Sequence, residues 1–329
     1  MSHLKIATFN LENLFLVAVD QEVTRTSLKS SDKTSKLSRT IKRISPDILF
    51  ACEVGGIDSL KKLNSQYLDD QYIPSVIEGN SDRGIEIGYL INKDLELHCE
   101  QYTHRNRGLH FLYPHEKVLN QRYKDDHPKW TEDELPYQDH LLSRDIAEMR
   151  FYAKEDVDKK GPPLLITLGV HLKSKWDQDG IDEQGRLRRG AEAKLLIKTY
   201  QDLKKRWPQT HIFLLGDFNG VVNGPNNDKE LSTFHELEED LVEVLEYLNL
   251  PYPKRATYIL FTPSGTSPQQ LDYIYFPKKL ADQVVKEESG IFYYQDEEGN
   301  ALALPQNPYQ RHPLPSDHYP LVLTLKSFH

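Results

Sequence analysis

The feature that most restricts how this chain can fold is a pattern that recurs in four segments far apart in the sequence. In each segment, an apolar and strand-like run has acidic, amide or imidazole side chains at one end. A rigid strand fixes the position of a side chain at its end, which suits a binding or catalytic site. Each segment alone is also typical of a solvated turn, so the evidence lies in their joint occurrence. The polar groups are Asn10, Glu53, Asp217 with Asn219, and Asp317 with His318.

Hydrophobic periodicity predicts a mixture of strands and helices along the whole chain. Apolar positions recur at helical spacing before Pro46, and further helices are expected near 58–67, 183–206 and, as an acidic amphipathic helix, 230–248. Because no repeat or Gly/Ser linker interrupts this mixture, we expect a single domain spanning 1–329. Strands are expected at 4–9, 48–52, 72–77, 85–91, 146–153, 164–170, 211–215, 271–276 and 319–325.

The segment from about 99 to 143 departs from this pattern, because His, Tyr, Arg and acidic residues crowd together without clear periodicity. It is too long for an ordinary connection, so we predict an irregular insertion. Six histidines in or beside it leave a metal cluster open. Their spacings match no zinc signature, and we favour a polar surface insertion that shapes a substrate groove.

Composition narrows the cellular setting. The two cysteines, Cys52 and Cys99, form no CxxC, which argues against a disulfide framework or a zinc–thiolate site and favours the cytoplasm. No apolar run approaches the ~18 residues that span a bilayer, so we expect no stable membrane insertion. The net charge of −9 counts against broad, non-specific binding of duplex DNA, although a local basic patch remains possible. We expect a monomer.

The polar groups at the strand ends are rich in carboxylate and amide oxygen and contain no thiolate. Hard oxygen donors are the ligands preferred by Mg²⁺, with Mn²⁺ as a possible substitute. A cation held by carboxylates beside imidazoles suits the hydrolysis of a phosphate ester. The sequence carries no P-loop, nucleophile elbow or HExxH helix. The candidate set is Asn10, Glu12, Glu53, His171, Asp217, Asn219, Asp272, Asp317 and His318.

Taken together, these segments resemble the endonuclease/exonuclease/phosphatase superfamily, which includes apurinic endonucleases and deoxyribonuclease I-like enzymes. The resemblance runs from Thr8-Phe9-Asn10 to Ser316-Asp317-His318, and its most specific parts are Gly216-Asp217-Phe218-Asn219 and Ser316-Asp317-His318. It implies an α/β (α+β) four-layer sandwich, in which two mostly antiparallel sheets pack face to face with helices outside.

The resemblance also implies a metal shell. In the family, the residue that matches Glu53 is the principal metal ligand. Glu12 and Asp317 match acids in the same shell, and Asn10 supports it. The expected cofactor is therefore Mg²⁺.

The remaining matches imply catalytic roles. His318 is expected to act as the general base, or alternatively to contact and orient the phosphate, and Asp272 would orient His318. Asp217 and Asn219 would position water and phosphate. His171 would donate a hydrogen bond to a phosphate oxygen.

Two further residues, Arg144 and Glu86, fall where relatives of the deoxyribonuclease I type place substrate contacts. The mid-chain tyrosine of apurinic endonucleases has no match that we can place. We therefore predict a Mg²⁺-dependent hydrolase of phosphoric esters, a nuclease that cuts phosphodiester bonds by direct attack of water on nucleic acid. A phosphatase or phospholipase C-like enzyme on a small or lipid substrate is the alternative, and a non-catalytic binding protein is the third hypothesis.

Overall fold

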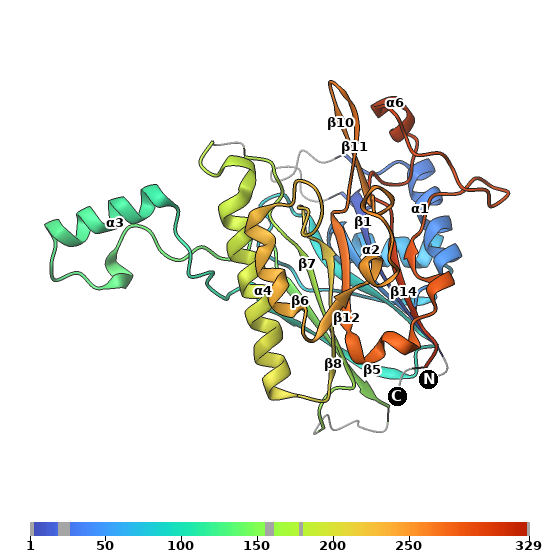
Figure 1. Ribbon diagram of the computed structural model, residues 1–329, viewed down its shortest axis with the longest axis horizontal. Helices are drawn as coiled ribbons and strands as arrows, with labels where there is room; N and C mark the ends of the chain where they lie inside the picture. Colours follow the sequence, from blue (N-terminus) through green and yellow to red (C-terminus); the bar gives the residue numbers. More distant parts are fainter. Residues whose placement is uncertain (1–2, 19–26, 155–160, 178–179, 328–329) are drawn as a thin grey trace.

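Two six-stranded sheets pack against each other, with helices on their outer faces, in the computed structural model shown in Figure 1. The structure describes residues 3–18, 27–154, 161–177 and 180–327. One continuous apolar core fills the space between the sheets and includes Ile6, Phe50, Met149 and Phe213. The predicted four-layer α/β sandwich is confirmed.

The first sheet has the order β13-β14-β1-β2-β4-β3. β1 and β2 are parallel, and the other neighbours are antiparallel. Helices α1 (Ser31–Ile44) and α2 (Gly56–Tyr67) cover its outer face through an apolar stripe. The strands are β13 (Gly290–Ile291), β14 (Leu321–Leu325), β1 (Leu4–Leu14), β2 (Ile48–Val54), β4 (Glu86–Asn92) and β3 (Tyr72–Val76).

The second sheet has the order β5-β6-β7-β8-β12-β9, and only β7 and β8 are parallel. The long helix α4 (Arg186–Arg206) and the 3-10 segment η3 (Lys229–Leu237) pack on its outer face. The strands are β5 (Leu97–Thr103), β6 (Ile146–Ala153), β7 (Leu165–His171), β8 (His211–Asp217), β12 (Asp272–Pro277) and β9 (Leu241–Glu243).

A steric detail explains how closely the two sheets approach near the strand ends. The ring of Phe50 on β2 lies over Gly169 on β7, where a Cβ atom would come within 2.2 Å of the ring. Gly216 on β8 has φ of +134°, and a Cβ there would lie 1.9 Å from the Val170 carbonyl oxygen on the neighbouring strand β7 and 3.0 Å from the Phe50 ring of the other sheet. Such contacts require glycine, since only glycine lacks the clashing atom. The close approach brings the ends of β1, β2, β7 and β8 together.

One expected helix was wrong, and several strands were not predicted. The helix expected at 230–248 is instead η3, β9 and the short helix α5 (Val244–Tyr247), because β9 pairs with β12 and tertiary pairing overrides local helix propensity. Edge strand β5 was missed because its side chains are polar and partly exposed. The hairpin of β10 (Tyr258–Thr262) and β11 (Gly265–Gln269), which projects from the body in Figure 1, was also missed.

The segment predicted to be irregular at about 99–143 contains regular structure. Besides most of β5 it holds helix α3 (Pro114–Asp126), in which Glu116 and Asn120 are the buried positions. A helix without an apolar stripe produces no hydrophobic periodicity, so α3 was not predicted from the sequence. Residues 109–140, here called the arm, extend away from the body in Figure 1, and the Leu109 amide donates to the His140 carbonyl at 2.9 Å where the arm begins and ends.

The remaining elements are short. No helix among the described ranges is long and apolar enough to cross a bilayer. The short elements are η1 (Glu132–Glu134), η2 (Glu183–Gly185), η4 (Tyr252–Lys254), η5 (Lys278–Gln283), η6 (Lys286–Glu288) and α6 (Pro308–Arg311).

Candidate active site

A cavity of about 560 Å³ lies where the ends of the central strands meet, and it draws its walls from both sheets. Of the eleven predicted site residues, eight line this cavity although they come from positions as far apart as 10 and 318. Glu12, Glu86 and Asp272 do not line it. The eight are Asn10, Glu53, Arg144, His171, Asp217, Asn219, Asp317 and His318.

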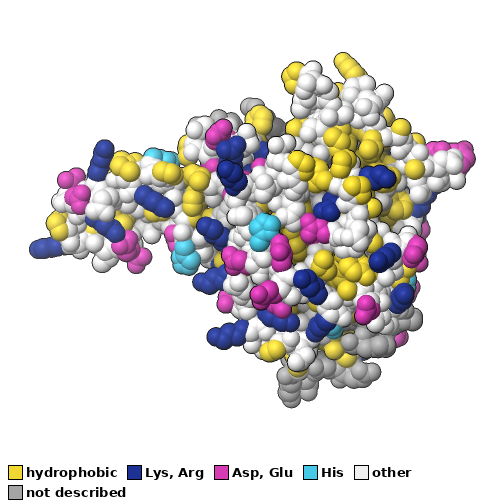
Figure 2. All heavy atoms as spheres, in the orientation of Figure 1, with side chains coloured by type: hydrophobic (Ala, Val, Ile, Leu, Met, Phe, Trp, Pro, Cys, Tyr) yellow, Lys and Arg dark blue, Asp and Glu magenta, His cyan; other side chains and the backbone are white. Residues whose placement is uncertain are grey.

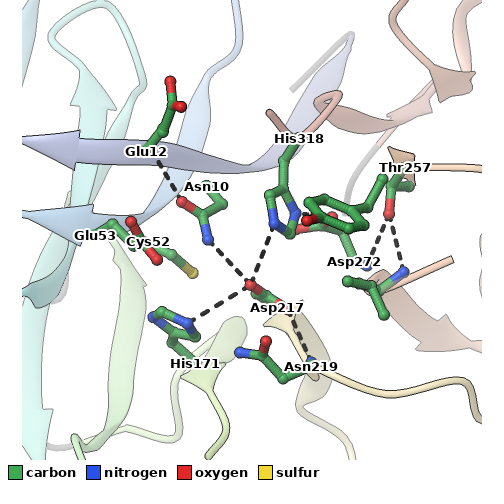
Figure 3. A network of polar contacts seen from close by, with 12 residues as sticks. Asn10, Glu12, Cys52, Glu53, His171, Asp217, Asn219, Thr257, Asp272 and His318 are labelled. Carbon is green, nitrogen blue, oxygen red and sulfur yellow. Dashed lines mark hydrogen bonds and ion pairs between the residues drawn. The ribbon is translucent and has the colours of Figure 1, made fainter. Parts of the chain in front are cut away.

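The carboxylate of Asp217, at the end of β8, is the centre of the polar contacts drawn in Figure 3. Its Oδ2 accepts a hydrogen bond from Asn10 Nδ2 at 3.0 Å, and its Oδ1 accepts from the Asn219 backbone amide at 2.8 Å. The Nε2 atoms of His171 and His318 lie 3.6 and 3.8 Å from Oδ2. Burial raises the pKa of Asp217 to about 7, and the nearby His318 opposes that rise.

The His318 imidazole contacts the carboxylate of Asp272, the residue that the resemblance expects to orient it. The Nδ1 atom of His318 lies 2.8 Å from Asp272 Oδ2, and both side chains are buried. Thr257 Oγ1 accepts hydrogen bonds from the backbone amides of Leu271 and Asp272, both at 3.0 Å, which fixes the start of β12. Burial alone would lower the pKa of His318, but the carboxylates of Asp272 and Asp217 outweigh it and hold that pKa well above its ordinary value.

Two side chains to which the sequence assigned no role, Ser316 and Tyr294, fix the turn before β14. The Ser316 hydroxyl donates to the Asn10 carbonyl at 2.7 Å, and its oxygen accepts from the His318 amide at 3.2 Å. The Tyr294 hydroxyl donates to the His318 carbonyl. The turn that carries Asp317 and His318 is therefore tied to the end of β1, more than three hundred residues away in sequence.

His171 and Arg144 form the opposite wall. Arg144 is buried, and its Nη1 donates to the carbonyls of His171 at 3.2 Å and Leu172 at 3.1 Å. Burial, reinforced by the Arg144 charge, lowers the pKa of His171 well below its ordinary value. The two imidazoles of the cavity thus differ: burial favours the neutral form of His171, whereas the neighbouring carboxylates favour the cationic form of His318.

Glu53 and Asp317 are the carboxylates best placed to hold a divalent cation. Glu53 has φ of +60°, and one of its oxygens accepts from the Asn13 amide at 2.9 Å, which leaves the other oxygen for a ligand. Within the described ranges, the Asp317 carboxylate has no hydrogen-bond or ion-pair partner, and it is only half-buried. Together with the Asn10 amide, these oxygens fit the donor set that Mg²⁺ or Mn²⁺ requires.

Glu12 lies apart from the cavity, unlike the expected metal-shell acid. β1 and β2 lose their register between Asn10 and Leu14, and Glu12 itself has φ of +48°. In Figure 3 its side chain points away from the other labelled groups. Its Oε2 instead lies 2.8 Å from Lys33 Nζ and 3.4 Å from Lys29 Nζ.

Glu86, expected to contact substrate, is buried below the rim. Its Oε2 accepts from the Gly79 amide at 2.7 Å, so the side chain holds the loop that leads into β4. That loop presents Arg83 to the cavity instead. The sequence signal for Arg83 was only a charged residue beside Gly84, which is too common to be informative.

Other cavity residues were not predicted. Lys175 follows His171 by four residues, and its Nζ binds the Asp228 carboxylate at 2.7 Å. Tyr258 and Leu260 extend from β10 over the cavity and supply an apolar wall. The Arg311 guanidinium lies 5.7 Å from the Tyr258 ring centroid and supports this wall from behind.

Clusters with metal-ligand chemistry are rare in the described part of the chain. Among the described residues, Asp217, Asp272 and His318 are the only group of three His, Cys or acidic residues whose ligand atoms all lie within 4.8 Å of one another. Because the Nδ1 of His318 is already bonded to Asp272, a proton network explains this group better than direct ligation does. The arm histidines form no such group among the described residues.

Comparison with known proteins agrees with this geometry. A sequence model described as the Endonuclease/Exonuclease/phosphatase family matches residues 7–318. No curated protein matched the sequence. D. rerio TDP2 in complex with a single-strand DNA product is 16% identical with a TM-score of 0.58, over 98% of this chain and 99% of that one.

Two further solved structures show the same fold. The human Nocturnin catalytic domain with a bound sulfate anion is 16% identical with a TM-score of 0.58, over 99% of this chain and 95% of that one. Truncated Caenorhabditis elegans TDP2 is 14% identical with a TM-score of 0.55, over 98% of this chain and 97% of that one. At this level of sequence identity, the structural likeness supports only the fold. The match to the family's sequence model supports the assignment of the chain to that family. The chain belongs to the endonuclease/exonuclease/phosphatase family.

Proposed function

We propose that this protein is a Mg²⁺-dependent phosphodiesterase that hydrolyses nucleic acid by direct attack of water. The observation that carries the proposal is the meeting, in one cavity, of the Asp272–His318 pair, the Asp217 carboxylate and the incompletely satisfied carboxylates of Glu53 and Asp317. This set combines a cation site, a proton acceptor and a positive donor, which are the parts that phosphate ester hydrolysis requires.

The pKa shifts of His318 and Asp217 favour a different catalytic role for each residue. His318, held cationic, would donate to a non-bridging phosphate oxygen, which is the second of the two roles that the resemblance allows. Asp217, with its pKa raised to about 7, would accept the proton of the attacking water. The water oxygen then bonds to phosphorus, the bond from phosphorus to the leaving oxygen breaks, and that oxygen takes a proton from solvent.

A divalent cation held by Glu53 and Asp317, with Asn10 in support, would neutralise phosphate charge and polarise phosphorus. Asn219 serves the site through its backbone amide, which fixes Asp217, while its Nδ2 donates to the Leu172 carbonyl at 3.0 Å. His171 and Arg144 form the wall that would face phosphate oxygens.

Nucleic acid is the favoured substrate because cations and an aromatic ring flank the same opening. Arg83 and Lys175 could contact phosphates on either side of the scissile one, and Tyr258 offers a ring for a base or sugar. The relative solved with a single-strand DNA product supports the same class. We also propose that the enzyme is a cytoplasmic monomer with one domain, of which the arm is an insertion.

A phosphatase acting on a small phosphorylated molecule is the second candidate. The observation in its favour is that Lys175 is neutralised by Asp228, while Arg144 is buried and donates to two backbone carbonyls. Little free positive charge would then remain for neighbouring phosphates. A phospholipase C-like activity on lipid is the variant of this candidate with the least support.

Hydrolysis assays separate these candidates. Single-stranded DNA, duplex DNA, RNA, nucleotides, inositol phosphates and sphingomyelin should be compared with Mg²⁺, Mn²⁺ and EDTA. We expect turnover of nucleic acid that EDTA abolishes. His318→Ala and Glu53→Ala should each lower the rate by roughly 10²–10⁴-fold, because each removes a charge that faces the phosphate or the cation.

Matched surface variants serve as controls. His235→Ala removes an exposed imidazole paired with Glu238, and Glu287→Ala removes a carboxylate remote from the cavity. Both should keep the wild-type rate. Wild-type rates for both His318→Ala and Glu53→Ala would refute the assigned roles, and turnover of small monoesters alone would favour the phosphatase.

A further inference from the structure

A second concave surface, here called the α4 groove, lies beside the catalytic cavity. It has a volume of about 820 Å³ and runs between the arm, the N-terminal half of α4 and η3. Figure 1 places η3 beside α4, with the arm leaving on the other side of that helix. Nothing in the proposed reaction uses this groove.

Positive charge dominates the rim of the α4 groove, although the whole chain has a net charge of −9. Four exposed cations line it, from three separate segments: Lys117, Arg186, Lys194 and Lys229. In the described structure, the three lysines have no carboxylate within ion-pair distance. Figure 2 shows Lys and Arg side chains along the arm and over the adjoining edge of the body.

The two acidic residues of the α4 groove do not cancel this charge. Glu230 is bound by the buried guanidinium of Arg189, so its charge is already compensated. Glu236 remains as the single carboxylate without a cationic partner among the described residues that line the groove. The excess of cations therefore persists where a ligand would lie, and it selects for an anion with several separated charges.

The floor of the groove is apolar. Leu109 and the half-buried Phe111 come from the arm, and Leu187, 44% exposed, comes from α4. An apolar floor with an aromatic ring between separated cations suits unpaired bases, which stack on rings while their phosphates meet Lys and Arg. The bases of a duplex are paired and stacked on each other, so they cannot stack on this ring, and a single strand fits the floor better.

The α4 groove continues from the catalytic cavity along two segments. Gln184 lines the cavity, and Arg186, two residues later, lines the groove. Lys175 of the cavity binds Asp228, which directly precedes Lys229 of the groove. Arg189 ties these segments together, because its Nη1 donates to the Gln184 carbonyl at 2.8 Å and the Lys173 carbonyl at 3.1 Å.

We propose that the α4 groove binds the single-stranded nucleic acid chain where it extends beyond the catalytic cavity, with the arm as one wall. This inference rests on the proposed function and specifies its substrate as a strand that spans several nucleotides. The contacts are to backbone phosphates and base faces, so binding does not depend on sequence.

The test compares binding and turnover in one triple variant. Lys117→Glu/Lys194→Glu/Lys229→Glu should bind a labelled 20-mer of deoxythymidine at least tenfold more weakly than wild type, by fluorescence anisotropy in EDTA. The slope of log K against log salt should fall by about 2, since each lost contact to a single strand is worth about 0.7. Hydrolysis of bis(p-nitrophenyl) phosphate, which fills only the cavity, should stay within twofold of wild type.

A second triple variant controls for total charge. Lys61→Glu/Lys205→Glu/Lys254→Glu makes the same change at exposed lysines that do not line the groove, and it should bind the 20-mer like wild type. Equal weakening by both triples, or none by the groove triple, would overturn the inference. If the reversals prevent folding, glutamine at the same three positions should still weaken binding.

The two proposals can fail separately. Wild-type protein that hydrolyses no phosphodiester, with any metal, refutes the proposed function whatever the anisotropy shows. Wild-type protein that hydrolyses the small diester but binds the 20-mer through no groove residue refutes only the α4 groove.

Discussion

At the scale of single residues, burial shifts the pKa values of the cavity's titratable side chains in different directions. Burial disfavours charge, so it lowers the pKa of His171 and raises that of Asp217. His318 is equally buried, yet the contact with Asp272 reverses the effect. The family resemblance gave the two imidazoles different roles, but the sequence could not predict their opposite pKa shifts, because these arise from neighbours that are distant in the chain.

Two of the three acids predicted for the metal shell, Glu53 and Glu12, should also differ in their effect on Mg²⁺ binding, because Glu53 lines the cavity and Glu12 does not. Glu53→Gln should weaken Mg²⁺ binding by at least tenfold, since it replaces a carboxylate that has an oxygen free for a ligand. Glu12→Gln should change it less than threefold, because Lys29 and Lys33 already neutralise Glu12. Isothermal titration of each variant with Mg²⁺ measures both effects.

A larger loss of Mg²⁺ affinity in Glu12→Gln than in Glu53→Gln would show that the Glu12 carboxylate binds the ion instead of Lys29 and Lys33. Lys33→Met provides the control, because it frees the Glu12 carboxylate from its nearer partner without altering Glu53. Mg²⁺ binding to this variant should match wild type if Glu12 is no ligand.

At the scale of elements, the sequence predicted most of the central strands and the ends that carry the site. Apolar strands such as β7 and β8 are buried on both faces, so their composition alone identifies them. The misses share a different cause. β5 is a polar edge strand, and β9 depends on pairing with β12, which no local pattern encodes. The first strand was expected only at 4–9, so neither its continuation through Glu12 to Leu14 nor the loss of register that turns Glu12 away was predicted.

One of the missed elements carries a buried acid whose titration should be measurable. Glu243, at the end of β9, is 1% exposed, and its side chain accepts from the Glu246 amide at 2.9 Å as the N-cap of α5. Burial raises its pKa from 4.5 to about 8. The folded state therefore retains a proton that the unfolded state releases, and this contribution to stability, present below about pH 4.5, is lost as the pH rises to about 8.

Glu243→Gln should remove this dependence, because glutamine keeps the acceptor oxygen and carries no charge. Relative to the variant, the free energy of unfolding of the wild type should fall by a few kcal/mol between pH 5 and pH 8, at about 1.4 kcal/mol per pKa unit. Urea unfolding of both proteins at several pH values measures the difference. Parallel pH curves would show that Glu243 is ionised in the folded protein.

At the scale of the whole molecule, the site depends on how two sheets pack, and local patterns do not specify that packing. The contact of Phe50 with Gly169 sets the approach of the sheets beneath the cavity, yet neither residue stands out in the sequence. The four-layer sandwich was predicted from the family resemblance and not from local sequence patterns. Net charge was a poor guide in the same way, since an acidic chain carries the basic α4 groove on one side.

Deleting most of the arm tests whether the packing of the two sheets depends on it. Its two ends already lie together, because the His140 amide donates to the Phe111 carbonyl at 3.2 Å and Gly108 bridges to Leu141. Replacing residues 113–138 with an Asn-Gly turn should therefore close a short hairpin without straining the body. We expect the thermal midpoint to stay within a few degrees, and hydrolysis of bis(p-nitrophenyl) phosphate to stay within twofold. A midpoint lowered by ten degrees or more, measured by circular dichroism, would show that the arm is part of the folding unit.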